Sequence, residues 1–184
     1  MRFLLPCLYT KSRLLTRALF IRFYDFETLL PLRGQGARIS FPEVNFTQIP
    51  VHIKGGSIIP LRANSANTTT ELRKENFKLL IAPGLDGCAK GSLYLDDGES
   101  LMQDSVSEIE FSYDAHGSFK MSGTFGYDVG DVRVKEVVVL GQIEEPQGLT
   151  EEAKWKKEGQ SVSYQVDMSF TEEKRMNLVG AQGI

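Results

Sequence analysis

The sequence is poor in the residues that build metal centres and disulfide frameworks. Among 184 residues there are two cysteines, two histidines and one tryptophan. Cys7 and Cys88 lie far apart in the chain, which fits neither a disulfide framework nor the short spacing of zinc ligands. His52 and His116 likewise lack the spacing of a metal pair. We therefore expect no metal site and no other cofactor.

Strong charge of one sign and long apolar runs are also missing. The net charge is −3, and no basic stripe indicates a nucleic-acid partner. No stretch approaches the roughly 18 consecutive apolar residues that a membrane span needs. Apolar residues nevertheless make up 41% of the chain, enough for a globular core. The sequence predicts a folded domain with neither a nucleic-acid partner nor a membrane span.

Residues 1–22 differ from the rest, because they contain basic residues and no acidic one. The stretch FLLPCLY behind Arg2 is similar to the apolar part of a signal peptide, but no small-residue cleavage site follows it. The arginine-rich character also suits a mitochondrial presequence. We favour a third interpretation, in which residues 1–22 are a non-native lead-in to a domain that begins later.

Apolar and polar residues alternate along much of the chain after residue 36, which is typical of strands buried on one face. Such alternation occurs in EIEFSY (108–113), GSFKMSGTF (117–125) and SVSYQVDMSF (161–170). Three further runs read as strands because they are apolar or β-branched: FKLLIA (77–82), GSLYL (91–95) and VRVKEVVVL (132–140). Turn residues separate these runs, so the pattern predicts an all-β fold of the sandwich type.

Two segments do not fit this pattern. LTEEAKWKKEG (149–159) resembles a helix, with Thr150 as its N-cap and Gly159 as its stop signal. RANSANTTTELRKEN (62–76) is polar, and we interpret it as a linker between two units.

Several motifs together resemble the C-terminal region of glycoside hydrolase family 31, the family of the α-glucosidases. The three main stretches, in order, are IPVHIKGGSIIPL (49–61), NTTTELRKENFKLLIA (67–82) and GSLYLDDGES (91–100). Weaker likenesses flank them: FYDFET (23–28), RGQGARISFP (33–42) and VKEVVVLGQ (134–142). The resemblance implies an antiparallel β-sandwich over residues 67–184, preceded over residues 23–66 by an incomplete second sandwich.

The catalytic groups of that family lie on a (β/α)8 barrel, and the resemblance does not extend to it. The family nucleophile is the aspartate of a D-[MLI]-N-E motif, which this sequence lacks; DMSF (167–170) shares only two letters with it. A barrel takes about 250 residues, more than this chain can supply. We therefore expect no catalytic residue here, and a missing barrel as the partner.

The stretch LYLDDGES (93–100) places three carboxylates close together, at Asp96, Asp97 and Glu99. A retaining glycosidase holds two carboxyl groups about 5–5.5 Å apart across the substrate. Adjacent strand residues instead point to opposite faces, so Asp96 and Asp97 should diverge. We predict a reverse turn in which Gly98 has a positive φ. A peripheral calcium or sugar contact is the alternative.

Other candidate residues have structural interpretations. His52 lies between apolar neighbours without an evident nucleophile, so we expect a structural histidine, and we expect Lys54 to be a surface or interface charge. Aromatic residues could form a platform for a sugar, although alternating positions favour the core. These aromatic residues are Tyr94, Tyr113, Tyr127 and Trp155, of which Trp155 is expected to be the most exposed.

Two Asn-x-Thr tripeptides would accept N-linked glycans in the secretory pathway, at Asn45 and Asn67. By resemblance, the parent enzyme is secreted or passes through that pathway and hydrolyses terminal α-glucosidic bonds. We expect this chain to be an accessory segment of such an enzyme, inactive alone. The alternatives are a free-standing carbohydrate-binding sandwich and an inert remnant.

Overall fold

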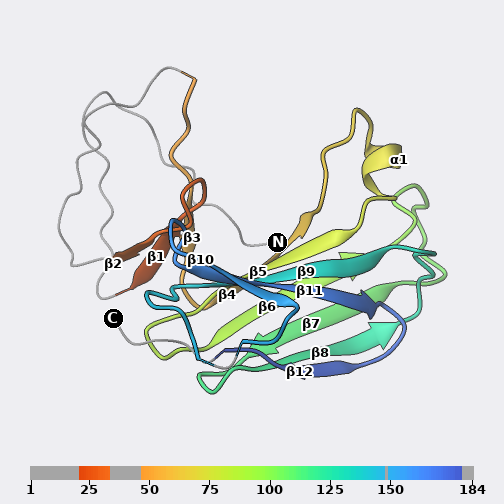
Figure 1. The fold of residues 1–184 in the computed structure, drawn as a ribbon. Helices are drawn as coiled ribbons and strands as arrows, with labels where there is room; N and C mark the ends of the chain where they lie inside the picture. Colours follow the sequence, from red (N-terminus) through yellow and green to blue (C-terminus); the bar gives the residue numbers. More distant parts are fainter. Residues whose placement is uncertain (1–20, 34–46, 148, 180–184) are drawn as a thin grey trace.

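The computed structural model describes residues 21–33, 47–147 and 149–179, and these form two sheets (Figure 1). The smaller sheet has the strand order β2-β1-β3. It consists of β1 (Arg22–Asp25), β2 (Pro31–Arg33) and β3 (His52–Lys54). Both pairings in this sheet are antiparallel.

The larger sheet has nine strands in the order β10-β11-β9-β5-β4-β6-β7-β8-β12. Its first strands are β4 (Ser57–Arg62), β5 (Phe77–Ala82), β6 (Ala89–Leu95), β7 (Ser107–Tyr113) and β8 (Ser118–Phe125). The others are β9 (Arg133–Leu140), β10 (Ala153–Lys156), β11 (Ser161–Ser169) and β12 (Lys174–Asn177). Most neighbours are antiparallel, whereas β4–β6 and β5–β9 are parallel.

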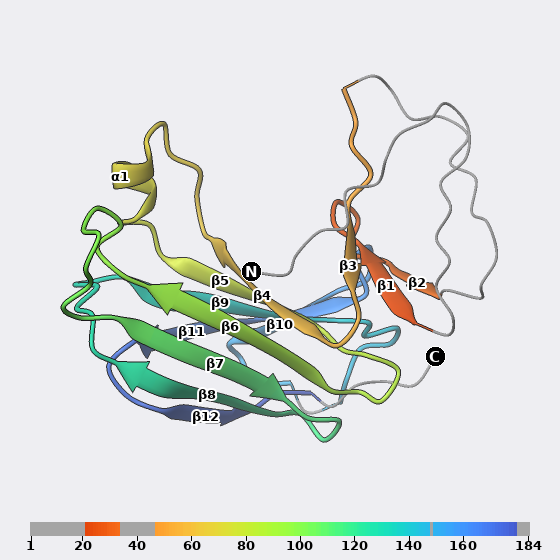
Figure 2. The same cartoon turned by 180° about the vertical axis from the view of Figure 1, so that it is seen from behind.

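The nine-stranded sheet folds over on itself into two layers, as Figures 1 and 2 show. One layer holds β4, β5, β9, β10 and β11, and the other holds β6, β7, β8 and β12. The layers join where β4 meets β6, at the pairing of Ser57 with Lys90. The main core fills the space between them, and its largest fully buried side chains include Phe111, Phe119 and Phe170. The predicted all-β fold is confirmed.

Two neighbouring strands, β5 and β9, are buried on both faces. Leu79 of β5 and Val137 of β9 face the main core, whereas Leu80 and Val138 belong to a second cluster. The smaller sheet supplies the other side of that cluster, through Tyr24 and Ile53. A second covering layer explains why these two strands read as continuous apolar runs.

The expected helix at 149–159 is wrong. Residues 153–156 form β10, which pairs antiparallel with β11. Ala153 and Trp155 pack against the main core, and Lys154 and Lys156 are exposed. Because the two lysines line the edge of the sheet, their charge discourages pairing with another chain. Tertiary pairing has overridden a local helical tendency.

The segment expected to be a linker joins β4 to β5 within the larger sheet. It contains a short helix, α1 (Thr69–Leu72), which stands off from the sheet in both views (Figures 1 and 2). The division into units at residues 22, 66 and 67 remains a prediction.

Candidate functional site

The loop that follows β6 is organised by the side chain of Asp97. Its Oδ1 accepts hydrogen bonds from the backbone N–H groups of Glu99 and Ser100, both at 3.0 Å. The Gln103 amide donates to Oδ1 at 3.0 Å, and the Ser100 hydroxyl donates to Oδ2 at 2.5 Å. Gly98 has φ = +70°, so its predicted positive φ is confirmed, and the chain bends at residues 98–99.

These contacts stabilise the ionised form of Asp97. The Ser100 hydroxyl, the backbone N–H groups of Glu99 and Ser100 and the Gln103 amide hold the pKa of this carboxyl well below its usual range. A general acid needs the opposite shift, because it must carry a proton near neutral pH. Asp97 is therefore suited to closing a turn, not to donating a proton.

Asp96 faces a different partner. Arg73 Nη2 lies 3.1 Å from Asp96 Oδ1, and Arg73 Nη1 donates to the Asp96 carbonyl at 2.7 Å. Glu99 is exposed. The three carboxylates thus diverge, and in the part of the chain described here no three metal-ligating side chains come together.

Arg73 reaches this loop from the α1 segment, whose N-terminal end is capped by a side chain. Thr68 is the N-cap of α1, and its hydroxyl accepts the Glu71 N–H at 3.2 Å. Arg73 is the C-cap residue, so the six-residue stretch TTTELR spans the helix from cap to cap.

A second arginine anchors the same segment to the sheet. Arg62, at the end of β4, donates from Nη1 to the carbonyls of Arg73 at 3.1 Å and Glu75 at 2.6 Å. Its guanidinium also lies 3.9 Å from the centroid of the Phe77 ring, a cation–π contact. Arg62, Arg73 and Asp96 therefore connect β4, α1 and the loop after β6. We call these three residues the arginine clamp.

The arginine clamp was not found by sequence reasoning. Arg73 and Asp96 come from two motifs, TTTELR and DDGES, that are far apart in the chain, and Arg62 ends β4. Their joint occurrence was the available signal, but only the fold shows that Arg73 and Asp96 touch.

The FYDFET stretch (23–28) also has a structural role, because its side chains close a turn and join the two sheets. Asp25 Oδ1 accepts the N–H groups of Glu27 and Thr28 and the Thr28 hydroxyl, at 3.1, 2.8 and 2.9 Å. This closes the turn between β1 and β2. The Tyr24 hydroxyl donates to the Pro83 carbonyl at 2.9 Å and so joins the smaller sheet to the end of β5.

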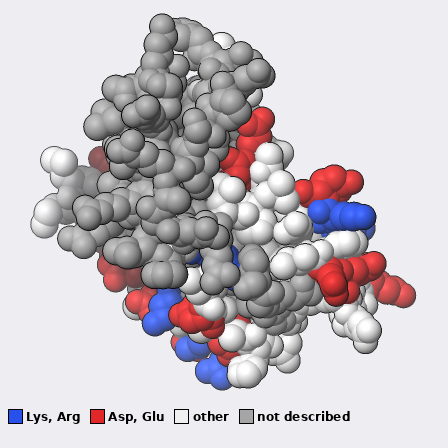
Figure 3. Space-filling model, turned by 90° about the vertical axis from the view of Figure 1, so that its left-hand side faces the viewer, with Lys and Arg blue, Asp and Glu red and all other residues white. Residues whose placement is uncertain are grey.

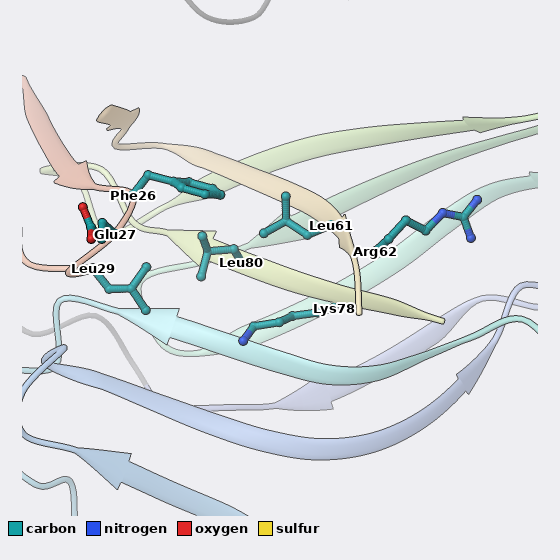
Figure 4. Close-up of a pocket in the computed structure, with 7 residues that line it drawn as sticks. All are labelled: Phe26, Glu27, Leu29, Leu61, Arg62, Lys78 and Leu80. Atoms are coloured by element: carbon teal, nitrogen blue, oxygen red, sulfur yellow. The ribbon is translucent and has the colours of Figure 1, made fainter. Parts of the chain in front are cut away.

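A shallow hollow lies between this turn and the outer face of the larger sheet (Figure 4). It is lined by Phe26, Glu27, Leu29, Leu61, Arg62, Lys78 and Leu80. Both cations are already engaged, Arg62 in the arginine clamp and Lys78 in an ion pair with Glu136 at 3.0 Å. What the hollow offers is an apolar contact surface, of which Phe26 is 43% exposed.

Three further candidate residues, His52, Lys54 and Asp167, lie on strands β3 and β11. His52 is half-buried on β3 opposite Asp25, and Lys54 is exposed. Their proposed structural and surface roles remain predictions. Asp167, from the DMSF stretch, is exposed on β11 and pairs with Lys135 at 2.7 Å.

The aromatic candidates do not form a platform. Trp155 was expected to be the most exposed, and this is wrong: it is half-buried, and its ring N–H donates to the Gln142 carbonyl at 3.0 Å. Tyr113 is buried, with its hydroxyl bonded to the Val179 carbonyl. Tyr127 packs against the main core, whereas Tyr94 is 52% exposed on β6. The four aromatic side chains thus have separate surroundings.

Of the two Asn-x-Thr sites, Asn67 is exposed just before α1. Asn45 lies outside the described residues.

Figure 3 shows one end of the molecule, where acidic and basic side chains of the described residues are interspersed and form no patch of a single charge. Within the described ranges, no helix is long and apolar enough to cross a membrane.

Comparisons with known proteins find that the chain is similar to glucosidases. No family model matches the chain. The chain is 43% identical over 162 residues, 85% of its length, to the probable α/β-glucosidase agdC of Aspergillus clavatus. It is 53% identical over 120 residues, 65% of its length, to the probable α/β-glucosidase agdC of Neosartorya fischeri. These alignments span only 18% and 13% of the two relatives.

Solved structures show the same fold. An ER glucosidase II heterodimeric complex, comprising the catalytic subunit and the binding domain of the regulatory subunit, matches with a TM-score of 0.63 at 19% identity. The match covers 86% of this chain and 20% of the other. The chain thus corresponds to a small part of much longer proteins.

Proposed function

The chain belongs to the C-terminal part of the family 31 glycoside hydrolases of α-glucosidase type, and from this we propose that it is an accessory β-sheet segment of such an enzyme. The observation that carries the proposal is the alignment over 85% of the chain with only 18% of a glucosidase. The parent enzyme would hydrolyse terminal α-glucosidic bonds with groups on a catalytic barrel elsewhere in its sequence.

We further propose a division of the segment into residues 23–66, the end of a proximal sandwich, and residues 67–184, a distal sandwich, with residues 1–22 as a lead-in. The separate three-stranded sheet supports the first unit. Strand β4 links the two, because it follows β3 directly and pairs with β5.

The role of this segment is to support and contact the barrel. Three features favour support over chemistry: the ionised, turn-closing Asp97, the engaged Asp96, and the arginine clamp. The hollow beside Phe26 and Leu61 offers an apolar surface for such a contact. A parent enzyme in the secretory pathway is part of the proposal, and the two Asn-x-Thr sites agree with it.

A chimera tests the proposal. Residues 21–179 would replace the aligned segment of the Aspergillus clavatus glucosidase, with deletion of that segment as the control. We expect the chimera to hydrolyse an aryl α-glucoside and the deletion variant to be inactive or insoluble. This chain alone should not turn over maltose or an aryl α-glucoside.

Two results would overturn the proposal. One is turnover by the isolated chain that survives repurification, because the chemistry would then lie in this segment. The other is full activity of the deletion variant, because the segment would then support nothing. Micromolar to millimolar binding of maltooligosaccharides by the isolated chain, without turnover, would favour the free-standing carbohydrate-binding alternative.

A further inference from the structure

The segment between β4 and β5 holds Asn67 out in solvent. Asn67 lies in a bend that belongs to neither a strand nor a helix, one residue before the N-cap of α1. Both views show α1 standing off from the sheet (Figures 1 and 2). An acceptor asparagine must enter the active site of a transferase, and a projecting, exposed position allows this.

The polar groups needed for modification are available at this position. Among the described residues, the side-chain amide of Asn67 has no hydrogen-bond partner, and the same holds for the hydroxyl of Thr69. The nearby Asn64 differs, because its amide donates to Glu75 at 2.8 Å. Thr68, the middle residue of the tripeptide, uses its hydroxyl to cap α1.

The different roles of the three side chains in Asn67-Thr68-Thr69 agree with N-glycosylation. That modification requires the asparagine amide and the hydroxyl two residues later, while the middle position only has to avoid proline. Here the Asn67 amide and the Thr69 hydroxyl have no hydrogen-bond partner among the described residues, and the middle residue, Thr68, caps the helix. A bulky glycan at Asn67 would therefore displace no side-chain hydrogen bond among the described residues.

We propose that Asn67 is an N-glycosylation site, with a lipid-linked diphosphate oligosaccharide as the co-substrate. In the transfer, the Asn67 side-chain nitrogen forms a bond to C1 of the first sugar, and the bond from C1 to the phosphate oxygen breaks. The lipid diphosphate leaves with the electron pair, and the amide loses one proton to a base of the transferase. This inference does not rest on the accessory role proposed above.

Secretion of the full chain from a yeast host, behind a cleavable signal peptide, tests this site. A C-terminal tag bearing one known acceptor tripeptide reports that the chain met the transferase. Amidase release of glycans in heavy-oxygen water converts a modified asparagine to labelled aspartate, so mass spectrometry of the peptides reads each site separately. We expect label at Asn67 in most molecules.

Matched variants separate the chemistry from the local structure. Asn67→Gln and Thr69→Ala should abolish the label at position 67, whereas Thr69→Ser should keep it. Thr68→Ala, which removes the helix cap but leaves the tripeptide intact, should also keep it. Modification of the tag with Asn67 unlabelled would overturn the proposal, and so would unchanged labelling in Thr69→Ala.

Discussion

Gly98 has φ = +70° and sits against the guanidinium of Arg73, so it resists substitution for two reasons. A Cβ at this position would lie 1.8 Å from Arg73 Nη2. Gly130 has φ = +63°, and a Cβ built there would meet nothing within 4 Å. A substitution at Gly130 therefore measures the cost of the backbone strain alone. We expect Gly130→Val to cost about 1–3 kcal/mol of unfolding free energy and Gly98→Val to cost more, measured by urea unfolding.

A double variant shows whether the additional destabilisation in Gly98→Val comes from the clash with Arg73. Arg73→Ala removes the atoms that the new side chain would meet. The combined Gly98→Val and Arg73→Ala change should therefore cost less than the sum of the two single changes. Strict additivity would show that Arg73 moves aside without loss.

Asp97 should make stability depend on pH. Its pKa is lowered in the folded chain by the Ser100, Glu99 and Gln103 contacts, whereas an unfolded aspartate titrates near about 4. The stabilisation is thus fully present above about pH 4 and is lost as the pH falls further. Asp97→Asn should lower the melting temperature at pH 7, and its difference from the unsubstituted chain should shrink in more acidic solution.

Glu99→Gln is the matched control for this experiment, because it removes a charge from the same loop and leaves the acceptor of the turn's hydrogen bonds, the Asp97 carboxylate, in place. It should melt like the unsubstituted chain at each pH. A constant difference between Asp97→Asn and the unsubstituted chain from pH 7 to pH 2 would contradict the assignment.

At the scale of elements, α1 depends on the arginine clamp for its position. A four-residue helix is too short to be stable by itself. Arg62→Met keeps much of the side-chain volume but loses the bonds to the Arg73 and Glu75 carbonyls and the contact with Phe77. We expect a loss of about 1–3 kcal/mol. Amide hydrogen exchange should become faster in residues 68–76 and 96–100.

Lys74→Met is the control for Arg62→Met, because Lys74 is an exposed cation of the same segment and makes no ion pair among the described residues. It should leave exchange unchanged. Faster exchange in residues 68–76 alone would mean that Arg73 holds the loop after β6 without help from Arg62.

At the scale of the whole molecule, Tyr24 joins the two sheets. It is fully buried, packs with the cluster that includes Leu80 and Val138, and donates to the Pro83 carbonyl. Tyr24→Phe loses only the hydrogen bond, so it should cost about 1 kcal/mol. Tyr24→Ala also empties a large buried site and should cost about 3–5 kcal/mol, measured by urea unfolding.

Amide hydrogen exchange then shows which strands are destabilised by Tyr24→Ala. In Tyr24→Ala, exchange should quicken in β1 and β3 and remain slow in β7 and β8, because the main core does not include Tyr24. Equal quickening in all four strands would show that the two sheets unfold together.

The sequence by itself determined the strands whose two faces meet different surroundings. Ile109, Phe111 and Tyr113 alternate with polar residues, and the structure buries all three because an antiparallel strand places alternate side chains on one face. Asp97-Gly98 likewise fixed its own turn through contacts within a few residues. Such features depend on local geometry, which the sequence specifies directly.

Only the tertiary structure decided the features that depend on distant partners. Residues 153–156 became a strand because β11 offered an edge to pair with, although the local pattern favours a helix. Leu80 and Val138 are buried because a second sheet lies over the outer face of β5 and β9. Arg73 meets Asp96 because two connections emerge at the same end of the folded sheet, and no local rule brings them together.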